Sequence, residues 1–213
     1  MTEPLSPPIL HPSPESFDRA ADIIAQGGIV VVPTKSIYVL VCDAFQPAAL
    51  ARLRAVRHSP PDKPLTIVMD KTRVPEFAVL DERQRRIVDL FLPSPVSLWV
   101  SKKDHRLDAA VCTSPVIVVY YQDSEVGQLY QRYGNLLAIS SSNHRHHPDA
   151  ATIQEAVAYF GPSVDLYLDG GPPRGTKPSA HLDIRYCPAI LRREAPHFPL
   201  QRIRDILTAH GLE

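Results

Sequence analysis

The sequence predicts a mixed α/β fold in which helices cover one twisted, mixed sheet. Short β-branched runs alternate with amphipathic segments along the whole chain, as expected for strands and helices that share one layered domain. Apolar residues make up 44% of the 213 residues, which is enough to bury a sizeable core. Polar residues follow several of the buried runs, at the strand ends where open α/β sheets bind ligands.

The first helix and the first buried strand have clear boundaries. Residues 13–15, Ser-Pro-Glu, start a helix with a capping hydroxyl, a proline in the first turn and an acid near the positive helix end. The glycine pair at 27–28 ends it, and residues 29–33 are a run typical of a strand buried on both faces. Residues 1–12 are rich in proline and are expected to form an extended arm before a single domain at 13–213.

The same alternation continues to the C-terminus. Strands are expected at residues 65–69, 96–100, 116–121, 136–140, 164–168 and 190–191. Helices are expected at residues 47–57, from a cap at Asp81 to Phe91, at 125–133, from a capping box that begins at Thr152, and at 200–210. We find no linker and no internal repeat, so one domain is expected.

The overall composition excludes several classes of protein. Lysine plus arginine equals aspartate plus glutamate at 23 each, which argues against a purely electrostatic nucleic-acid binder. The three cysteines are far apart, so no disulfide framework is expected. A reducing, cytoplasmic location is expected instead. The N-terminus lacks the basic start and apolar stretch of a signal peptide, and no apolar run approaches the roughly 20 residues that span a membrane.

Three polar segments each have a structural and a functional interpretation. Residues 33–38 place two hydroxyls, an ammonium and a phenol after a buried strand, either as a cap with a half-buried tyrosine or as a phosphate or carboxylate site. Residues 52–65 hold four cations and a histidine, either as a solvated helix end or as a loop for a polyphosphate. Residues 140–143, Ser-Ser-Ser-Asn, form either a turn or a nucleotide contact.

Two further loops are less specific. Residues 144–147, His-Arg-His-His, match no standard zinc spacing, so a solvated loop is favoured over a metal site. Residues 170–179 form a glycine- and proline-rich loop with two cations, either a phosphate contact or a wide turn. No nucleotide-binding or hydrolase motif of fixed spacing occurs. The patterns alone therefore predict an α/β protein with an anion-binding cleft.

The order and spacing of these segments resemble the YrdC family, including its YciO branch. Gly-Gly-Ile-Val leads into Pro-Thr-Lys-Ser-Ile-Tyr-Val-Leu, and an arginine-led segment leads into Lys-Pro-Leu. The resemblance continues through Pro-Ser-Pro-Val-Ser, Ser-Ser-Ser-Asn, Asp-Gly-Gly, a Pro-Ser-Ala segment and a final Leu-Arg. In this sequence the matching stretches are 27–30, 33–40, 57–65, 93–97, 140–143, 169–171, 175–183 and 191–192. The match covers about residues 15–195 and implies a YrdC-like fold with a concave ligand cleft.

The resemblance also implies an activity. YrdC-like enzymes condense L-threonine, bicarbonate and ATP into threonylcarbamoyl-adenylate and release pyrophosphate. The product feeds modification of the adenosine next to the tRNA anticodon, and some members bind double-stranded RNA. ATP is therefore the expected nucleotide substrate, with Mg²⁺ carried by the nucleotide, L-threonine or a similar small molecule is the expected second substrate, and tRNA or double-stranded RNA is an expected partner.

The same resemblance assigns the small-molecule contacts. Thr34 and Ser179 would hold the threonine end of the ligand. Ser141 and Asn143 would contact the nucleotide, and Tyr38 would shape the pocket. Hydroxyl and amide groups suit these roles because they donate and accept hydrogen bonds without bringing charge.

The cations are assigned to the phosphates. Lys63 and Arg57 would face them, and Arg192 would help to anchor them. Arg57 stands where the family has lysine, a change that keeps the charge but alters its geometry. Lys35 stands where the family has an acid, and it is a further candidate for binding the anionic substrate.

Other departures favour a second hypothesis. Val39 replaces a glycine beside the ligand, Ala180 replaces a threonine, and Ser59 and Tyr120 each replace an arginine. Each lost charge-assisted hydrogen bond weakens binding by roughly 1.5–3 kcal/mol. The alternatives to a threonylcarbamoyl-adenylate synthase are therefore a YciO-like enzyme acting on a related adenylate and a module that binds nucleotide or double-stranded RNA without synthesis. A carbamoyl-transfer domain ranks third, since such enzymes carry zinc fingers.

Overall fold

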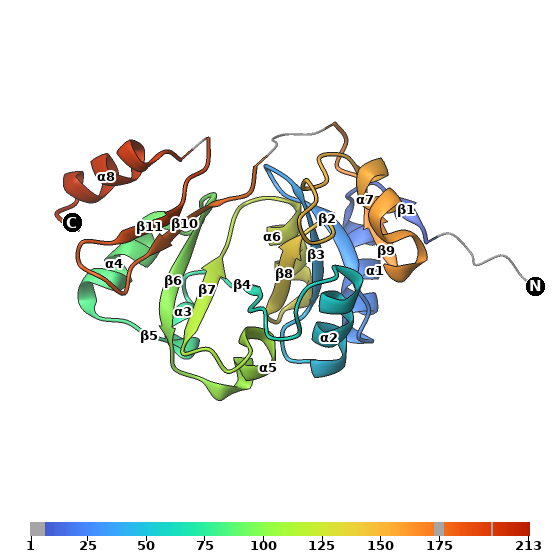
Figure 1. The fold of residues 1–213 in the computed structure, drawn as a ribbon, viewed down its shortest axis with the longest axis horizontal. Helices are drawn as coiled ribbons and strands as arrows, with labels where there is room; N and C mark the ends of the chain where they lie inside the picture. Colours follow the sequence, from blue (N-terminus) through green and yellow to red (C-terminus); the bar gives the residue numbers. More distant parts are fainter. Residues whose placement is uncertain (1–6, 173–176, 197) are drawn as a thin grey trace, which may run out of the picture.

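One mixed sheet runs through the computed structural model, which describes residues 7–172, 177–196 and 198–213 (Figure 1). Its strands are β1 (Ile9–Leu10), β2 (Val30–Pro33), β3 (Tyr38–Asp43), β4 (Thr66–Val68), β5 (Ala78–Val79), β6 (Val96–Lys102), β7 (Val116–Tyr120), β8 (Leu137–Ser141), β9 (Leu166–Leu168), β10 (Ala180–Asp183) and β11 (Ile190–Arg193). Their order is β1-β9-β2-β3-β8-β4-β7-β6-β10-β11, and β5 pairs with β6. Parallel and antiparallel pairs both occur, which confirms the predicted mixed sheet.

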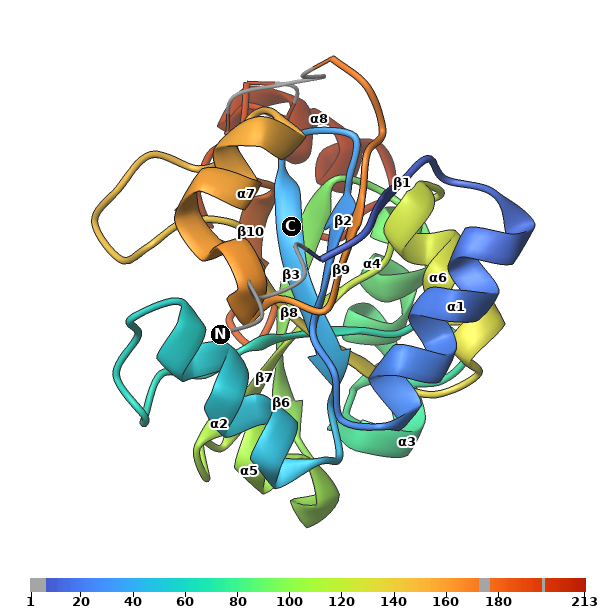
Figure 2. The same cartoon turned by 90° about the vertical axis from the view of Figure 1, so that its right-hand side faces the viewer.

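Helices cover both faces of this sheet. They are α1 (Pro14–Ala25), α2 (Pro47–Val56), α3 (Val74–Phe77), α4 (Glu82–Phe91), α5 (Asp108–Val111), α6 (Glu125–Tyr133), α7 (Ile153–Phe160) and α8 (Leu200–Ala209). In Figure 2, α1 and α6 lie side by side on one face of the sheet, and α2 and α7 lie on the other. Burial on both faces is seen in β2 and β3, in which every residue is buried.

The predicted helix starts are confirmed. Ser13, Asp81 and Thr152 are the N-caps of α1, α4 and α7. Each side chain accepts a hydrogen bond from the backbone N–H three residues later, and each forms a reciprocal capping box. These caps satisfy N–H groups that have no partner inside the helix, so short local patterns were sufficient to locate them.

Four strands were not predicted from the sequence: the two-residue β1 and β5, and the longer β3 and β10. β2 and β3 form an antiparallel hairpin in which Val32 faces Val39, so the chain turns back immediately after the first buried strand. Every residue of β3 is buried, including Asp43. β10 follows the glycine-rich loop and pairs in parallel with β6, which places Ser97 opposite His181. β3 and β10 are both needed to form the site described below.

Residues predicted to form an N-terminal arm take part in the sheet. Ile9 and Leu10 make up β1, which pairs in parallel with Tyr167 and Leu168 of β9. Residues 1–6 lie outside the described residues, as do residues 173–176 of the predicted glycine-rich loop. Within the described ranges, no helix is both long enough and apolar enough to span a membrane.

Candidate functional site

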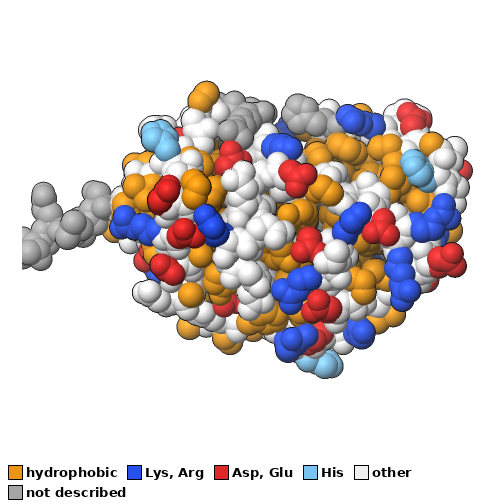
Figure 3. Space-filling model, turned by 180° about the vertical axis from the view of Figure 1, so that it is seen from behind, with side chains coloured by type: hydrophobic (Ala, Val, Ile, Leu, Met, Phe, Trp, Pro, Cys, Tyr) orange, Lys and Arg blue, Asp and Glu red, His pale blue; other side chains and the backbone are white. Residues whose placement is uncertain are grey.

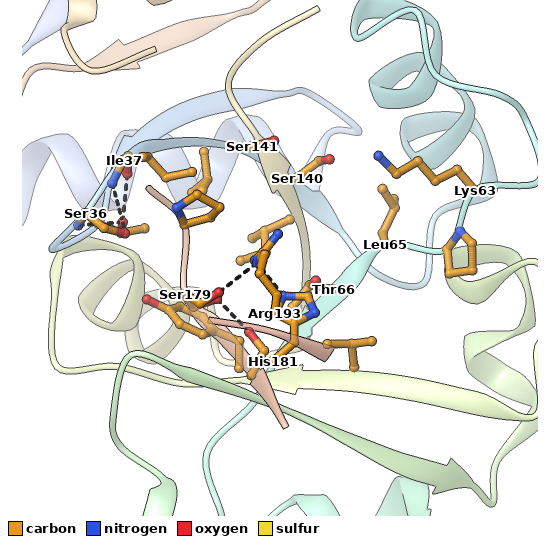
Figure 4. A pocket seen from close by; sticks show the side chains of 18 of the residues that line it. Ser36, Ile37, Lys63, Leu65, Thr66, Ser140, Ser141, Ser179, His181 and Arg193 are labelled. Carbon is orange, nitrogen blue, oxygen red and sulfur yellow. Dashed lines mark hydrogen bonds between the residues drawn. The ribbon is translucent and has the colours of Figure 1, made fainter. Parts of the chain in front are cut away.

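A cavity of about 360 Å³, the central cavity, opens over the middle of the sheet (Figure 4). Its lining comes from strands β3 through β11 in sheet order and from the loops that follow β2 and α2. Five polar residues predicted to bind substrate line it together: Thr34, Arg57, Lys63, Ser141 and Ser179. The tertiary fold thus collects side chains that are up to 145 residues apart in sequence, as 179 minus 34 gives.

Strand alternation forms much of the cavity floor. Ser97 and Trp99 of β6 line it, as do Val118 and Tyr120 of β7. Successive residues of a strand point to opposite faces, so each strand contributes every second side chain. The floor consequently combines apolar area with a few hydroxyl groups, as is common in small-molecule sites.

Thr34 organises the turn between β2 and β3. Its Oγ1 accepts hydrogen bonds from the backbone N–H groups of Ser36 and Ile37, both at 3.1 Å. It also donates to the carbonyl oxygen of Ile37 at 2.7 Å. Because the side chain replaces backbone partners inside the turn, Thr34 sets the shape of this corner of the cavity.

Arg57 holds the residues that follow β8. Only 7% of Arg57 is exposed. Its Nε donates to the carbonyl oxygen of Ser141 at 3.0 Å, and its Nη2 donates to Ser141 Oγ at 2.7 Å and to Asn143 Oδ1 at 2.9 Å. Burial is the main cause that lowers the pKa of Arg57. Asn143 itself does not line the cavity, so it acts on the site through Arg57.

Lys63 also lines the cavity, with its ammonium group pointing inward (Figure 4). Burial lowers its pKa most, and the positive charges of Arg57, Arg145 and Arg193 lower it further. In the described part of the chain, Lys63 has no acidic partner within ion-pair distance. A half-buried ammonium group surrounded by other cations favours binding of an anion.

Besides Asn143, three predicted site residues do not line the cavity. Lys35 is exposed and does not line the central cavity. Tyr38 points to the other side of β3, where its hydroxyl donates to Asp169 Oδ1 at 3.3 Å and accepts from the N–H of Gly170 at 3.1 Å. Arg192 donates through Nη2 to Asp183 Oδ2 at 2.9 Å. Asp183 is fully buried, so the role of this ion pair is structural: Arg192 neutralises a buried carboxylate.

The residues that depart from the family pattern also fall into two groups, those that line the cavity and those that do not. Val39 and Tyr120 line the cavity, where the Tyr120 hydroxyl donates to Gln122 Oε1 at 2.7 Å and burial raises the pKa of Tyr120. Ser59 accepts a long hydrogen bond of 3.4 Å from Arg57 Nη1. Ala180 is fully buried and does not line the cavity, since its chain neighbours Ser179 and His181 line it instead.

The cavity wall also contains Trp99, His181 and Arg193, which were not among the predicted site residues. The signal for Trp99 was present, because it lies two residues after Ser97 on a predicted strand and so shares its face. His181 lies two residues after Ser179, but β10 was not predicted, so no strand pattern indicated that the two share a face. Arg193 is next to the predicted Arg192, and only the pairing of β11 with β10 shows which of the two arginines faces the cavity.

The loop of residues 144–147, His-Arg-His-His, packs against aromatic residues. The rings of His58 and His144 stack with centroids 4.1 Å apart, and His144 also meets the rings of Tyr159 and Phe160 edge-on. Burial lowers the pKa of His144. Within the described ranges, no group of three or more histidine, cysteine or acidic residues is arranged to hold a metal ion.

The family profile named for Sua5, YciO and YrdC, and described as "Telomere recombination", matches residues 22–194. The chain belongs to the Sua5/YciO/YrdC family. Two curated Sua5/YciO/YrdC relatives are named threonylcarbamoyl-AMP synthase. That of Chromohalobacter salexigens is 32% identical over 178 residues, covering 80% of this chain and 95% of that protein. That of Cellvibrio japonicus is 27% identical over 168 residues, covering 78% and 89%.

Solved Sua5/YciO/YrdC structures have the same fold. P. abyssi Sua5 complexed with L-threonine superposes with a TM-score of 0.86 at 22% identity, over 94% of this chain. The matched region is only 61% of that Sua5 chain. E. coli YciO superposes with a TM-score of 0.75 at 20% identity, over 87% of this chain and 93% of that one. The predicted YrdC-like fold is therefore confirmed.

Proposed function

We propose that this protein is a threonylcarbamoyl-adenylate synthase, which condenses L-threonine, bicarbonate and ATP and releases pyrophosphate. The names of the curated relatives support this proposal, as does the similarity to P. abyssi Sua5, whose structure is a complex with L-threonine. The observation that carries it is the composition of the central cavity. Three cations, Arg57, Lys63 and Arg193, line it together with several hydroxyls, and its lining among the described residues includes no acidic side chain.

Charge is the first requirement of the proposed reaction. Threonine amine and bicarbonate give a carbamate and water, and a carbamate oxygen then attacks the α-phosphorus of ATP. The bond from that phosphorus to the bridging oxygen breaks, and pyrophosphate leaves with additional negative charge. Lys63 and Arg57, which both line the cavity, would offset this charge, as fixed cations do in phosphoryl-transfer sites.

Orientation is the second requirement. Ser179 lines the cavity at the start of β10, so its hydroxyl would hold the threonine end of the ligand, and Thr34 would shape this end of the cavity through the turn after β2. Ser141, fixed by Arg57, would contact the nucleotide. Holding both substrates in one cavity converts their encounter into a step within a single complex.

Magnesium fits this arrangement only as part of the nucleotide. Mg²⁺ prefers oxygen ligands and is usually bound through substrate phosphates and one or two carboxylates. The described cavity lining offers hydroxyls and cations but no carboxylate. We therefore assign Mg²⁺ to the ATP phosphates, where it would offset their charge, and assign no protein ligand to it.

Incubation of the purified protein with ATP, L-threonine and bicarbonate tests the proposal. Pyrophosphate release and a product with the mass of threonylcarbamoyl-adenylate are expected, and both should disappear when threonine is left out. A product formed only with another amino acid would instead indicate a YciO-like enzyme acting on a related adenylate. If ATP binds but no pyrophosphate appears with any amino acid, the protein is a nucleotide-binding module and the proposal is wrong.

RNA binding is the second activity to be tested. The protein has no net charge, and the face shown in Figure 3 carries lysine and arginine side chains intermixed with aspartate and glutamate. A broad positive surface is the usual footprint of a nucleic-acid binder, so that face does not support RNA binding. In the proposed function, tRNA receives the carbamoyl-threonine group from the released adenylate in a later reaction.

A further inference from the structure

The part of the central-cavity wall that β10 and β11 contribute contains a conflict between hydrogen-bond donors. Trp99 Nε1 lies 3.0 Å from His181 Nδ1, and Arg193 Nη2 lies 2.7 Å from His181 Nε2. Indole and guanidinium nitrogens can only donate. Both ring nitrogens of His181 would therefore have to accept, but a neutral imidazole has one acceptor and one N–H.

The side chains around His181 restrict its tautomers. Accepting from Trp99 at Nδ1 leaves the proton on Nε2, so that two donors meet at 2.7 Å. In the other tautomer the proton is on Nδ1, so the N–H of Trp99 faces a second donor instead. Full protonation worsens both contacts, and burial, followed by the charge of Arg193, lowers the pKa of His181 to about 3. With the residues described, every neutral state leaves one donor without an acceptor.

An acceptor atom from a ligand resolves the conflict. If an anionic oxygen sits beside His181 Nε2 and Arg193 Nη2, it accepts from both, and Trp99 keeps its hydrogen bond to Nδ1. Arg193 is held in place for this by its Nε, which donates to the carbonyl oxygen of Ser179 at 3.0 Å. Figure 4 shows Arg193, His181 and Ser179 together at one side of the cavity, with Lys63 at the other.

The charge of this wall matches a carboxylate. Arg193 brings one positive charge and neutral His181 brings only an N–H, so together they suit a monoanion. Lys63 and Arg57 bring two positive charges to the other side, which suits phosphate groups of higher charge. A planar guanidinium group also matches the geometry of a carboxylate.

We propose that Arg193 and His181 form a carboxylate-binding subsite that selects the amino-acid substrate by its α-carboxylate, an inference that rests on the proposed function. It takes the place of the cation that the resemblance places at Tyr120. Trp99 is a positioning residue in this subsite, because its N–H fixes the tautomer of His181.

Calorimetric titration with L-threonine and with L-threoninol, in which a hydroxymethyl group replaces the carboxylate, tests the subsite. The wild-type protein should bind threonine about tenfold or more tightly than threoninol. Arg193→Met should lose this preference and leave the Kd for ATP unchanged, and Arg193→Lys should keep part of it. Arg19→Met, an exposed arginine on α1, is the matched control and should behave like wild type. Thermal unfolding of each variant checks that it is folded.

Imidazole ¹⁵N shifts of His181 give an independent readout. Nδ1 should be the unprotonated nitrogen, and threonine but not threoninol should shift the Nε2–H signal. Equal binding of threonine and threoninol by the wild-type protein would overturn the subsite, as would an Arg193→Met variant that weakens ATP binding and spares threonine. Selective threonine binding without adenylate synthesis would refute the proposed function and leave the subsite intact. If Arg193→Met synthesises the adenylate with an unchanged KM for threonine, the subsite is refuted and the proposed function stands.

Discussion

Arg57 clamps Ser141 with two hydrogen bonds, one to its carbonyl oxygen at 3.0 Å and one to its hydroxyl at 2.7 Å. The two residues come from different elements, the end of α2 and the end of β8, so the clamp joins two sides of the cavity. The planar guanidinium makes both contacts at once, which a lysine ammonium group cannot reproduce with the same geometry.

Arg57→Lys is therefore expected to lower the free energy of unfolding by about 1.5–3 kcal/mol, because buried acceptors lose charge-assisted partners. ATP affinity should also fall, since Ser141 is no longer fixed. Urea unfolding and calorimetry measure the two effects. Arg19→Lys on the exposed face of α1 is the matched control and should change neither. An Arg57→Lys variant as stable as wild type would show that the clamp contributes little.

Removing the charge of Lys63 should separate binding from stability. Lys63→Met is expected to weaken ATP binding by about tenfold or more, because a cation facing the phosphates is lost. The free energy of unfolding should stay the same or rise, since neighbouring cations no longer repel a half-buried ammonium group. Fluorescence titration with ATP and urea unfolding test this. Lys71→Met, a surface lysine paired with Asp89, is the control. Unchanged ATP affinity would remove Lys63 from the phosphate site.

Lys35 is a residue on which the hypothesis drawn from the sequence and the arrangement in the structure differ. From the sequence, Lys35 is a candidate for binding the anionic substrate, whereas in the structure it is exposed and does not line the cavity. Lys35→Met is expected to leave ATP and threonine affinities within about twofold of wild type, because exposed charges are screened by solvent and salt. A tenfold loss measured in the same titrations would restore Lys35 to the site.

The Thr34 hydroxyl should be worth more than its size suggests. Thr34→Val keeps the shape of the side chain but leaves the N–H groups of Ser36 and Ile37 without their acceptor. A loss of about 1–3 kcal/mol in the free energy of unfolding is expected, since buried donors without partners are costly. Thr34→Ser retains the hydroxyl and should lose much less. If the two variants lose equal stability in urea, packing of the methyl group explains Thr34 instead.

His181 predicts how stability depends on pH. Its pKa is lowered from 6.5 to about 3 in the folded protein, mainly by burial. Between these two values the unfolded chain binds more protons than the folded protein, so stability is lost as pH falls from about 6.5 towards 3. His181→Gln should lessen this loss, measured as urea midpoints at pH 7 and pH 4.5. His146→Gln, an exposed histidine, should keep the wild-type pH dependence. Parallel profiles for wild type and His181→Gln would contradict the prediction.

The sequence was sufficient for most helices and strands and for the central group of site residues. Caps at Ser13, Asp81 and Thr152 are local, since each depends on residues within one helical turn. The hairpin strand β3 was missed because the turn that precedes it, residues 34–37, was interpreted as a ligand loop. Its structure depends on the Thr34 hydroxyl, which a pattern of residue types does not reveal.

By itself, the sequence determined the layered mixed sheet, the helix starts and the polar residues Thr34, Lys63, Ser141 and Ser179 that meet in one cavity. Only the tertiary structure decided that Arg193 faces this cavity and that its neighbour Arg192 binds the buried Asp183. The physical reason is strand register. Adjacent side chains of a strand point to opposite faces, and the pairing of β11 with β10, with its shift after His181, selects the face.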